Sequence, residues 1–377
     1  MHRLDSSDFP HVASLAQDLR DQGMAQAVLA GTRPGIVVTD DATAPTATLI
    51  AAPEGGFAWI YLAGNPDRRS FREELNAWLF EEHGLGDEVV FAFFACDDRA
   101  WEAALAEVLA PRVVIPDRRL HYECSEPPTA PPTGVPESYA IVPVDQAFLD
   151  SDTPVREEIT KWMSANFGSR EGFLEHGLGS VALHENRIVA WSLADSLVNG
   201  LCDIGIETDE EHRRRGLGAA VTRRTIDLAF ERGATRVGWH CHAINVPSRR
   251  TAERAGFEFR YEYSVYPVQF DPEKHVQLVP IIAGELVEAG NAALERGEAS
   301  EADRLFGLLL GFATDLEADV LHSAARAAAG SGAVDRAYEL LDAAVDRGWR
   351  SATHTEGRTE FESLREDPRW ETLLERM

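Results

Sequence analysis

The chain has 377 residues, 44% hydrophobic and 26% charged, a balance typical of globular protein that excludes a disordered or fibrous chain. Acidic residues outnumber basic ones 63 to 36, so the chain, with net charge −27, should bind neither nucleic acid nor an anionic membrane. No apolar run approaches the roughly 18 residues of a membrane helix, and the first residues lack a signal-peptide core. The four cysteines are scattered, so we expect a reduced, cytoplasmic protein without a structural zinc site.

Two stretches divide the chain. Residues 127–136 contain five prolines, and proline fixes φ and removes a hydrogen-bond donor, which predicts an extended linker over 126–137. A second boundary lies near Asp271-Pro272, after which the pattern turns strongly helical. We therefore expect three parts, residues 1–125, 138–270 and 275–377.

The first part mixes helical and strand patterns. In chain order, the sequence predicts a helix at 10–29, strands at 35–40, 46–51 and 57–63, a helix at 69–82, a strand at 88–95, a helix at 99–109 and a strand at 118–124. In the helix at 69–82, Phe71, Leu75, Trp78 and Leu79 recur at the spacing of one helical face.

The second part repeats much of that order. Helical stretches at 154–176 precede strands at 179–184, 187–194 and 201–208, then a helix at 217–232, a strand at 236–240, a short helix at 246–255 and a strand at 259–268. From the third strand onward both parts run strand, long helix, strand, helix, strand, which predicts a divergent internal duplication. Chance is the alternative, because alternating helices and strands are common.

The third part has a helical period of its own. Two units spaced 35 residues apart share a glycine, a small residue and two apolar residues at matching offsets: Gly297, Ala302, Phe306 and Leu309, then Gly332, Ala337, Leu341 and Ala344. This pattern resembles tetratricopeptide repeats, with an ordinary helical bundle as the competing interpretation. We expect this part to serve partner docking or self-association.

A loop rich in arginine and glycine follows the strand at 201–208. It reads Arg213-Arg214-Arg215-Gly216-Leu217-Gly218 and enters a helix, where three arginines oppose the helix macrodipole. A bound anion would remove this mismatch, because backbone N–H groups and arginines would converge on it. Gly216 and Gly218 would let a phosphate approach the backbone closely. The alternative is a solvated basic turn that caps a surface helix.

A second motif follows the strand at 236–240. It reads Asn245-Val246-Pro247-Ser248 and continues to Ala255-Gly256-Phe257. Asn245 suits a helix N-cap and Gly256 a helix end, which accounts for both without a ligand. An asparagine at a strand end can also bond the amides of a linear ligand.

Taken together, the two motifs resemble those of the GNAT N-acetyltransferase superfamily. Arg213-x-x-Gly216-x-Gly218 resembles its acetyl-CoA pyrophosphate loop, and Asn245-x-x-Ser248 with Ala255-Gly256-Phe257 resembles its second cofactor motif. The resemblance covers about residues 138–268. The sequences at 173–179 and 239–242 are similar to those of a bacterial branch of the superfamily that has a long N-terminal extension. It implies a tandem GNAT-like α/β fold with mostly antiparallel sheets, plus an all-α C-terminal module. Residues 1–125 would be a degenerate half, because its loop at 64–71 lacks the two glycines.

The resemblance implies an acyltransferase that moves an acetyl group from acetyl-CoA directly to an amine, without a metal. The cofactor contacts that it implies are Ile206, Glu207, Thr208, Arg213, Arg214, Arg215, Gly216, Leu217, Gly218, Ala219, Asn245 and Ser248. A backbone N–H at or beside Ile206 would stabilise the oxyanion.

The general acid is left open by the sequence. Many family members carry a tyrosine at the position of Ala252, so Tyr261, Tyr263, His240 and His242 are candidates by proximity, although each is more often a packing or surface residue. Cys241 fits a small buried thiol better than an acyl carrier.

Asp203 is the candidate base. Asp203 and Glu207 lie four apart on one strand, so they share a face unless a β-bulge separates them. Asp203 lies toward the side where an acceptor would enter, and a structural carboxylate is the alternative.

Two rival functions remain at this point. A non-catalytic acyl-CoA sensor would use the C-terminal helices for a partner, and the missing tyrosine favours it. A pure interaction scaffold is supported by the repeat-like tail alone. The sequence does not identify the acceptor.

Overall fold

The structure is a computed structural model that describes residues 1–96, 99–110, 116–129, 135–243, 245–270, 279–312 and 316–377. It forms two compact units, Met1–Asp271 and Pro272–Met377. Residues 130–134 of the expected linker, and the expected start of the third part at 275, lie outside the described residues.

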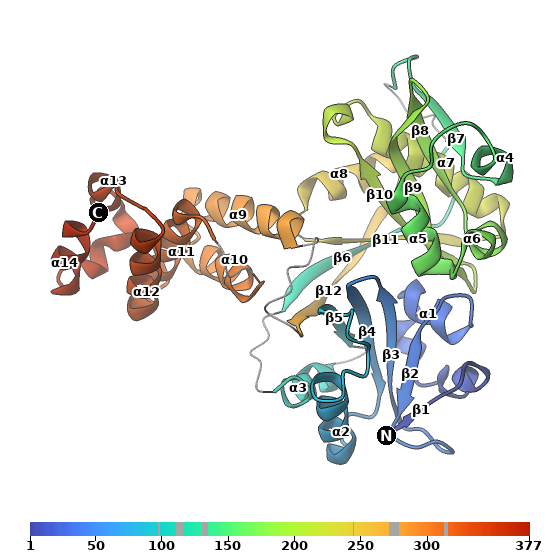
Figure 1. Cartoon of the computed structure of the whole chain (residues 1–377), viewed down its shortest axis with the longest axis horizontal. Coiled ribbons are helices and arrows are strands. Elements are labelled where there is room, and N and C mark those ends of the chain that lie inside the picture. The colour runs from blue at the N-terminus through green and yellow to red at the C-terminus, as the bar shows by residue number, and fades with distance from the viewer. Residues whose placement is uncertain (97–98, 111–115, 130–134, 244, 271–278, 313–315) are drawn as a thin grey trace. The chain divides into compact units, whose positions relative to one another are not determined.

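The first unit alternates strands and helices (Figure 1). Its elements are β1 (His2–Arg3), η1 (Ser6–Val12), η2 (Gln17–Leu19), α1 (Gly23–Leu29), β2 (Ile36–Thr39), β3 (Ala47–Glu54), β4 (Phe57–Gly64), α2 (Arg69–Phe80), β5 (Phe91–Cys96), α3 (Arg99–Val108), β6 (Asp117–Cys124), β7 (Ala140–Pro143), α4 (Gln146–Leu149), α5 (Glu157–Phe167), α6 (Arg170–His176), β8 (Gly179–His184), β9 (Arg187–Val198), β10 (Leu201–Thr208), η3 (Glu210–His212), α7 (Leu217–Glu231), β11 (Arg236–His242), α8 (Val246–Ala255) and β12 (Glu258–Gln269).

The predicted helix over residues 10–29 is wrong as a single element, because that segment forms two 3-10 turns and the short helix α1. Pro10, inside η1, cannot donate a helical hydrogen bond. The backbone N–H of Gly23 donates to the Asp203 carboxylate at 2.7 Å, so a tertiary contact takes a donor that a longer helix would use. The other predicted strands and helices of this unit are present. Those at 179–184, 201–208 and 246–255 have the predicted ends and the rest have shifted ends, whereas β1, β7, α4 and η3 were not predicted.

The strands of the described residues form one sheet of twelve, in the order β1-β2-β3-β4-β5-β12-β6-β11-β10-β9-β8-β7. Neighbouring strands run antiparallel except for the pairs β4–β5 and β10–β11, which are parallel. The prediction of a mixed α/β fold with mostly antiparallel strands is therefore confirmed.

The two sequence segments of this unit exchange their last strands. Strand β6 comes from the first segment but pairs with β11 and β12, while β12 closes the second segment and pairs with β5 and β6. The first unit is consequently one continuous sheet, in which neither segment completes its own strand order.

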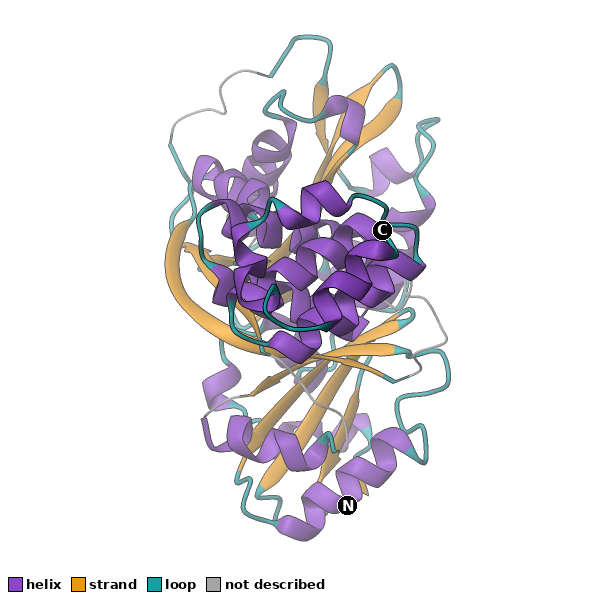
Figure 2. Ribbon diagram, turned by 90° about the vertical axis from the view of Figure 1, so that its left-hand side faces the viewer, coloured by secondary structure: helices purple, strands orange, loops and turns teal. Residues whose placement is uncertain are grey.

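The sheet curves around helix α1. This helix packs against β3 and also against β9 and β10, although six strands separate β3 from β9 in the sheet order. A seven-residue helix can contact both only if the sheet bends, and Figure 2 shows strongly curved strands. The sheet therefore has a concave face, which holds α1, and an opposite face on β8–β10 that α7 covers.

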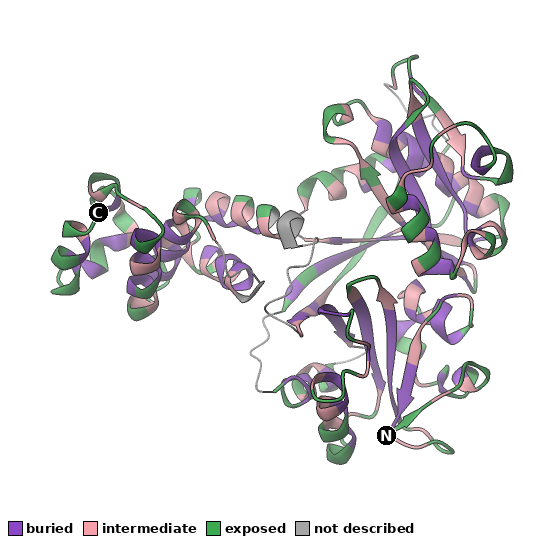
Figure 3. Cartoon of the chain, viewed as in Figure 1, coloured by how far each residue is buried: buried purple, intermediate pink, exposed green. Residues whose placement is uncertain are grey.

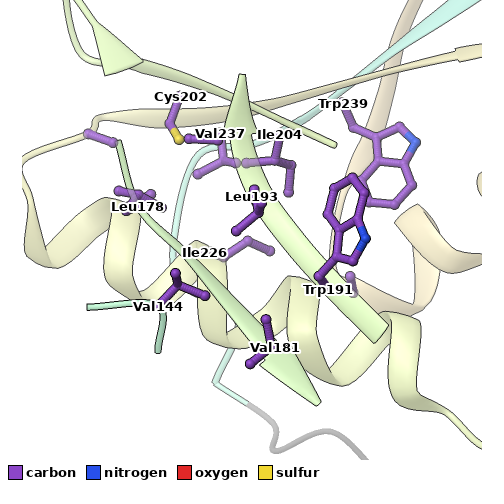
Figure 4. Close-up of a cluster of buried hydrophobic side chains, with 14 of the residues drawn as sticks. Val144, Leu178, Val181, Trp191, Leu193, Cys202, Ile204, Ile226, Val237 and Trp239 are labelled. Atoms are coloured by element: carbon purple, nitrogen blue, oxygen red, sulfur yellow. The ribbon is translucent and has the colours of Figure 1, made fainter. Parts of the chain in front are cut away.

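Apolar side chains fill both faces of the strands. Figure 3 shows β3, β4 and β9 as largely buried ribbons. In the second segment the core joins strand residues such as Val181, Leu193 and Ile204 to Ile226 of α7 (Figure 4). This packing fixes the position of β10, the strand on which the candidate site depends.

The second unit is helical, as predicted for the C-terminal part. Its elements are α9 (Val279–Glu295), α10 (Ala299–Phe312), α11 (Ala318–Gly330), α12 (Val334–Asp346), α13 (Ala352–Glu356), η4 (Thr359–Leu364) and α14 (Arg369–Glu375). Gly297 and Gly332, with φ of 75° and 89°, end the first helix of the pairs α9–α10 and α11–α12. Ala302 and Ala337 are fully buried where the helices meet. Whether these pairs are tetratricopeptide repeats stays a prediction.

Candidate active site

Strands β10 and β11 pair at first and then diverge within the sheet. Their parallel pairing is limited to Leu201–Asp203 against Arg236–Gly238, although β10 continues to Thr208 and β11 to His242. Beyond Asp203, the edge of β10 that faced β11 has no ladder partner in that strand. An extended ligand can pair with such an edge as an added strand would.

The two parallel strand pairs of the sheet differ in how far their pairing extends. Strands β4 and β5 occupy the corresponding place in the first segment, and they stay paired over six residues, Phe57–Leu62 against Phe91–Cys96. The slot between diverging strands is therefore present in the second segment and closed in the described part of the first.

The arginine-glycine loop connects β10 to the N-terminus of α7. Gly216 is the N-cap residue with φ of 78°, a left-handed conformation that glycine adopts without strain, and Arg214 has φ of 62°. The first turn of α7 contains no acidic residue. Helix N-termini present backbone N–H groups without intrahelical partners, so the loop is suited to an anion.

The three arginines have different surroundings, although all are exposed. Arg215 donates to the Tyr139 hydroxyl at 2.6 Å and to the Glu211 carbonyl at 3.1 Å, and Arg213 donates from Nε to the Thr208 carbonyl at 3.2 Å. Arg213 and Arg215 therefore also hold the loop in shape.

Gly218 lies where α7 meets the end of β10. A Cβ at this position would lie 3.2 Å from Ile206 Cδ1 and 3.4 Å from Thr208 Oγ1. Ile206 and Thr208 thus point toward α7. Within α7, Leu217 is buried and Ala219 is half-buried.

The second predicted cofactor motif has structural partners of its own. Asn245 caps α8, its Oδ1 accepting from the Ser248 N–H at 2.9 Å, and the Ser248 hydroxyl accepts from Trp239 Nε1 at 3.1 Å. Both residues stand at the end of β11, beside the opening between the strands. Their contact with a cofactor stays a prediction.

Asp203 is buried on the other face of β10. Side chains alternate along a strand, so Asp203 and Glu207 face away from Ile206 and α7, toward the concave side. A bulge does occur beside Asp203, but its extra residue is Asp195 on β9, and Asp203 and Glu207 keep the same face. Burial raises the pKa of Asp203 to about 7, an effect that the hydrogen bond from Gly23 opposes.

His240 links Asp203 to Tyr263. Its Nε2 lies 3.7 Å from Asp203 Oδ2 and 3.1 Å from the Asp21 carbonyl, and its Nδ1 lies 2.9 Å from the Tyr263 hydroxyl. Burial holds the pKa of His240 well below its usual value, so the ring is neutral. Nε2 also lies 3.2 Å from His121 Nδ1. Since the Asp21 carbonyl can only accept, we assign the proton to Nε2, and the Tyr263 hydroxyl then donates to Nδ1.

The remaining candidates have other partners, although the Tyr261 ring lies 6.1 Å from the Tyr263 ring, and His242 contacts Asp117 and Arg119. Tyr261 is partly exposed, and its hydroxyl donates to Asp21 at 3.2 Å. Glu207 is exposed, whereas Cys241 is buried beside Trp239, and burial raises the pKa of its thiol, which disfavours a nucleophilic thiolate. Of the predicted catalytic residues, the structure brings together Asp203 and Tyr263.

Sequence reasoning missed a set of polar groups on the concave face, of which Glu54 and Asp195 are half-buried and the rest buried. Most come from other strands and loops: Arg33, Glu54, Tyr61, Arg119, His121 and Asp195. They interact electrostatically with one another or with Asp203 and Tyr263, except His121, whose partner is His240 at 3.2 Å. No local motif marks them, and strand alternation would have found them only with the strand order known.

Two other classes of site are absent from the described ranges. No group of three or more His, Cys, Asp or Glu side chains there is arranged to hold a metal ion. Among the same residues, no helix combines the length and hydropathy needed to cross a membrane.

Comparison with known proteins agrees with this geometry. Over 266 residues the chain is 23% identical to the uncharacterized N-acetyltransferase YdfB of Bacillus subtilis, spanning 71% of this chain and 98% of that protein. A shorter match, 31% over 75 residues, links 20% of this chain to 45% of the uncharacterized N-acetyltransferase YjdG of the same organism. The crystal structure of a GCN5-related N-acetyltransferase-like protein from Streptococcus suis shares the fold, with a TM-score of 0.52 at 23% identity over 69% of this chain and 98% of that one.

The family profile described as GNAT acetyltransferase matches residues 13–266, which is more than half of the chain. Transfer of an acetyl group from acetyl-CoA is the general kind of reaction of this family. The protein belongs to the GNAT acetyltransferase family.

Proposed function

We propose that the protein is an N-acetyltransferase that uses acetyl-CoA and an amine acceptor, with its site at the divergence of β10 and β11. The observation that carries this proposal is the ladder that stops at Asp203 and Gly238, with a glycine-bearing helix N-terminus directly beyond it. The residues proposed to hold acetyl-CoA are Ile206 to Thr208, Arg213 to Ala219, Asn245 and Ser248.

The chemistry divides between the two faces of β10. Acetyl-CoA supplies the activated acetyl group as a thioester, and its phosphates suit the α7 N-terminus on one side. Asp203 lies on the other side, so the amine would reach the thioester from the concave face. A carboxylate whose pKa is about 7 is well matched to accept the proton of an amine near neutral pH.

Tyr263 is proposed to supply the proton for the departing sulfur. Burial raises the pKa of its hydroxyl, so Tyr263 is protonated at neutral pH. In the resting site this O–H donates to His240 Nδ1, so the hydroxyl would turn from Nδ1 toward the sulfur to deliver its proton, while His240 Nε2 lies close to Asp203. The net exchange forms a C–N bond and breaks a C–S bond, while one proton passes from the amine to the enzyme and one from the enzyme to the thiolate.

The test has two readouts on the full chain. Isothermal titration calorimetry should show binding of acetyl-CoA, and a thiol-release assay over a panel of primary amines should show turnover. Binding without turnover of any amine would contradict the transferase and favour the acyl-CoA sensor. Absence of binding would contradict both and leave the scaffold.

A further inference from the structure

Arg214 is the strained residue of the loop before α7. Its φ of 62° lies in the left-handed region, which residues other than glycine adopt at a cost and keep only where the surrounding structure holds them. Its exposed side chain makes no hydrogen bond or ion pair within the part of the chain that the structure describes. The residues on either side of Arg214 must therefore hold it in this conformation.

One hydroxyl, that of Tyr139, bonds to a residue on each side of Arg214. Arg215 Nη1 donates to this hydroxyl at 2.6 Å, and the hydroxyl oxygen lies 2.9 Å from His212 Nδ1. Because a guanidinium can only donate, the hydroxyl accepts from Arg215, and we assign its own proton to the bond with His212. The two bonds fix the chain both before and after the strained residue.

Tyr139 is held in place by contacts outside the loop. It directly precedes β7 and lies 73 residues before His212 in the chain. Its side chain is 8% exposed and belongs to a core cluster with Leu217 and Val221 of α7. The buried ring therefore sets the position of the hydroxyl, and the loop takes its shape from that fixed point.

We propose that Tyr139 is a positioning residue for the cofactor, whose hydroxyl keeps Arg214 left-handed and so holds the loop in the conformation that binds the pyrophosphate of acetyl-CoA. This assignment rests on the proposed cofactor site. A loop that already has its bound shape pays less ordering cost when the ligand arrives, and affinity rises accordingly. Tyr139 acts at the phosphate end, so it should contribute to cofactor binding and not to the chemistry at the thioester.

The test begins with Tyr139→Phe, which removes the hydroxyl and keeps the buried ring. Calorimetry should show acetyl-CoA binding about 5–30-fold weaker, the order of the strain that a left-handed residue stores. Dephospho-CoA, which keeps the pyrophosphate but lacks the 3′-phosphate, should lose affinity by the same factor. In steady-state kinetics, KM for acetyl-CoA should rise while kcat stays within about twofold.

Arg214→Asn provides the decisive comparison. Asparagine adopts the left-handed conformation far more readily than arginine does, without the added flexibility of glycine. If Tyr139 acts by holding residue 214, Tyr139→Phe should cost about threefold or less in affinity when made in the Arg214→Asn background. A merely structural role for the hydroxyl would give the same loss in both backgrounds.

Tyr338→Phe is the matched control, in the helical unit. The Tyr338 hydroxyl donates to the Leu364 carbonyl at 2.9 Å, and Arg369 lies 4.1 Å from the centroid of its ring. This variant also loses a hydrogen-bonded hydroxyl beside an arginine, and it should keep wild-type affinity for acetyl-CoA. Should Tyr139→Phe fail to fold, His212→Ala removes one of the two bonds, and it should give a smaller loss that also shrinks in the Arg214→Asn background.

Three results would overturn the assignment whether or not amines are acetylated. They are wild-type affinity in Tyr139→Phe, equal losses with arginine and asparagine at position 214, and a loss that disappears with dephospho-CoA. A loss that couples to Arg214, without turnover of any amine, supports the positioning role and contradicts the transferase instead. Failure of the wild-type protein to bind acetyl-CoA contradicts both.

Discussion

Asp203 is enclosed by two glycines from different parts of the chain. A Cβ at Gly238 would lie 2.0 Å from Asp203 Oδ1, and Gly23 donates its backbone N–H to Oδ2 at 2.7 Å. The carboxylate is thus held in one position at the point where β10 leaves β11. A group held in this way is suited to transfer a proton at a fixed location.

We expect Asp203→Asn to lower kcat by about 10²–10⁴, the range usual for losing a general base. The affinity for acetyl-CoA should be little changed, because the cofactor contacts lie on the opposite face of β10. Steady-state kinetics and calorimetry on the same preparation check both parts. Near-normal turnover in this variant would assign the base elsewhere.

The pH dependence of unfolding provides a separate test of Asp203. Burial raises its pKa from 3.8 in a model peptide to about 7, so the native state binds the proton more tightly than the unfolded chain. The contribution of this group to stability is fully present below about pH 4 and is lost as pH rises through about 7.

Denaturant unfolding of wild type and Asp203→Asn should therefore differ by an amount that changes between pH 4 and 8, with the variant gaining relative stability as pH rises. Turnover of the wild type should fall as pH drops below about 7, because only the ionised carboxylate accepts a proton. A pH-independent difference in unfolding free energy would show that the native pKa is not raised.

At the scale of elements, the loop before α7 combines two features that one substitution can separate. Gly216 adopts the left-handed conformation of the turn, whereas Gly218, which has no Cβ, allows the helix backbone to lie close to Ile206 and Thr208. The φ of Gly218 is not in the left-handed region, so a side chain there disturbs the space in front of the helix rather than the backbone.

Gly218→Glu should abolish acetyl-CoA binding in calorimetry, because it places a bulky negative charge where a phosphate is proposed to lie. Gly218→Ala is the matched control, since its Cβ would meet only side-chain ends at 3.2–3.4 Å, and it should keep most of the affinity. Circular dichroism should show both variants folded. Wild-type affinity in Gly218→Glu would refute the assignment of this loop.

The parallel pair β4–β5 leads to a prediction about stoichiometry. Its six paired residues leave no slot between these strands in the part of the chain that the structure describes, in contrast to the three paired residues of β10–β11. One CoA per chain should bind, and titration at protein concentrations well above Kd measures this. A value near two would contradict a degenerate first segment.

At the scale of the whole molecule, the exchange of β6 and β12 decides where the chain can be cut. Strand β12 ends at Gln269 and lies between β5 and β6, so any deletion that reaches it opens the middle of the sheet. The unit that follows is separately compact, from Pro272 to Met377.

A chain truncated after Phe270 should therefore keep its affinity for acetyl-CoA. The helical unit is proposed to serve docking or self-association, so its removal should change oligomeric state or partner binding rather than the chemistry. Calorimetry and light scattering on the truncated protein check these outcomes. Loss of cofactor binding by a truncated protein that remains folded would place part of the site in the helical unit.

The sequence by itself determined the features that are local in the chain. The loop Arg213–Gly218 and the cap at Asn245 are recognisable because all of their residues lie within a few positions of one another, and element types followed from hydrophobic periodicity. The continuous helix expected at 10–29 failed where a tertiary partner, Asp203, takes the N–H of Gly23.

Only the tertiary structure decided which distant residues meet. Tyr61 and Asp195 interact with Asp203, and Glu54 interacts with Asp195, because the sheet bends around α1 and exchanges its last strands. Strand order is set by the burial of whole sheet faces and by pairing between residues far apart in the chain, and neither leaves a mark on any short stretch of sequence.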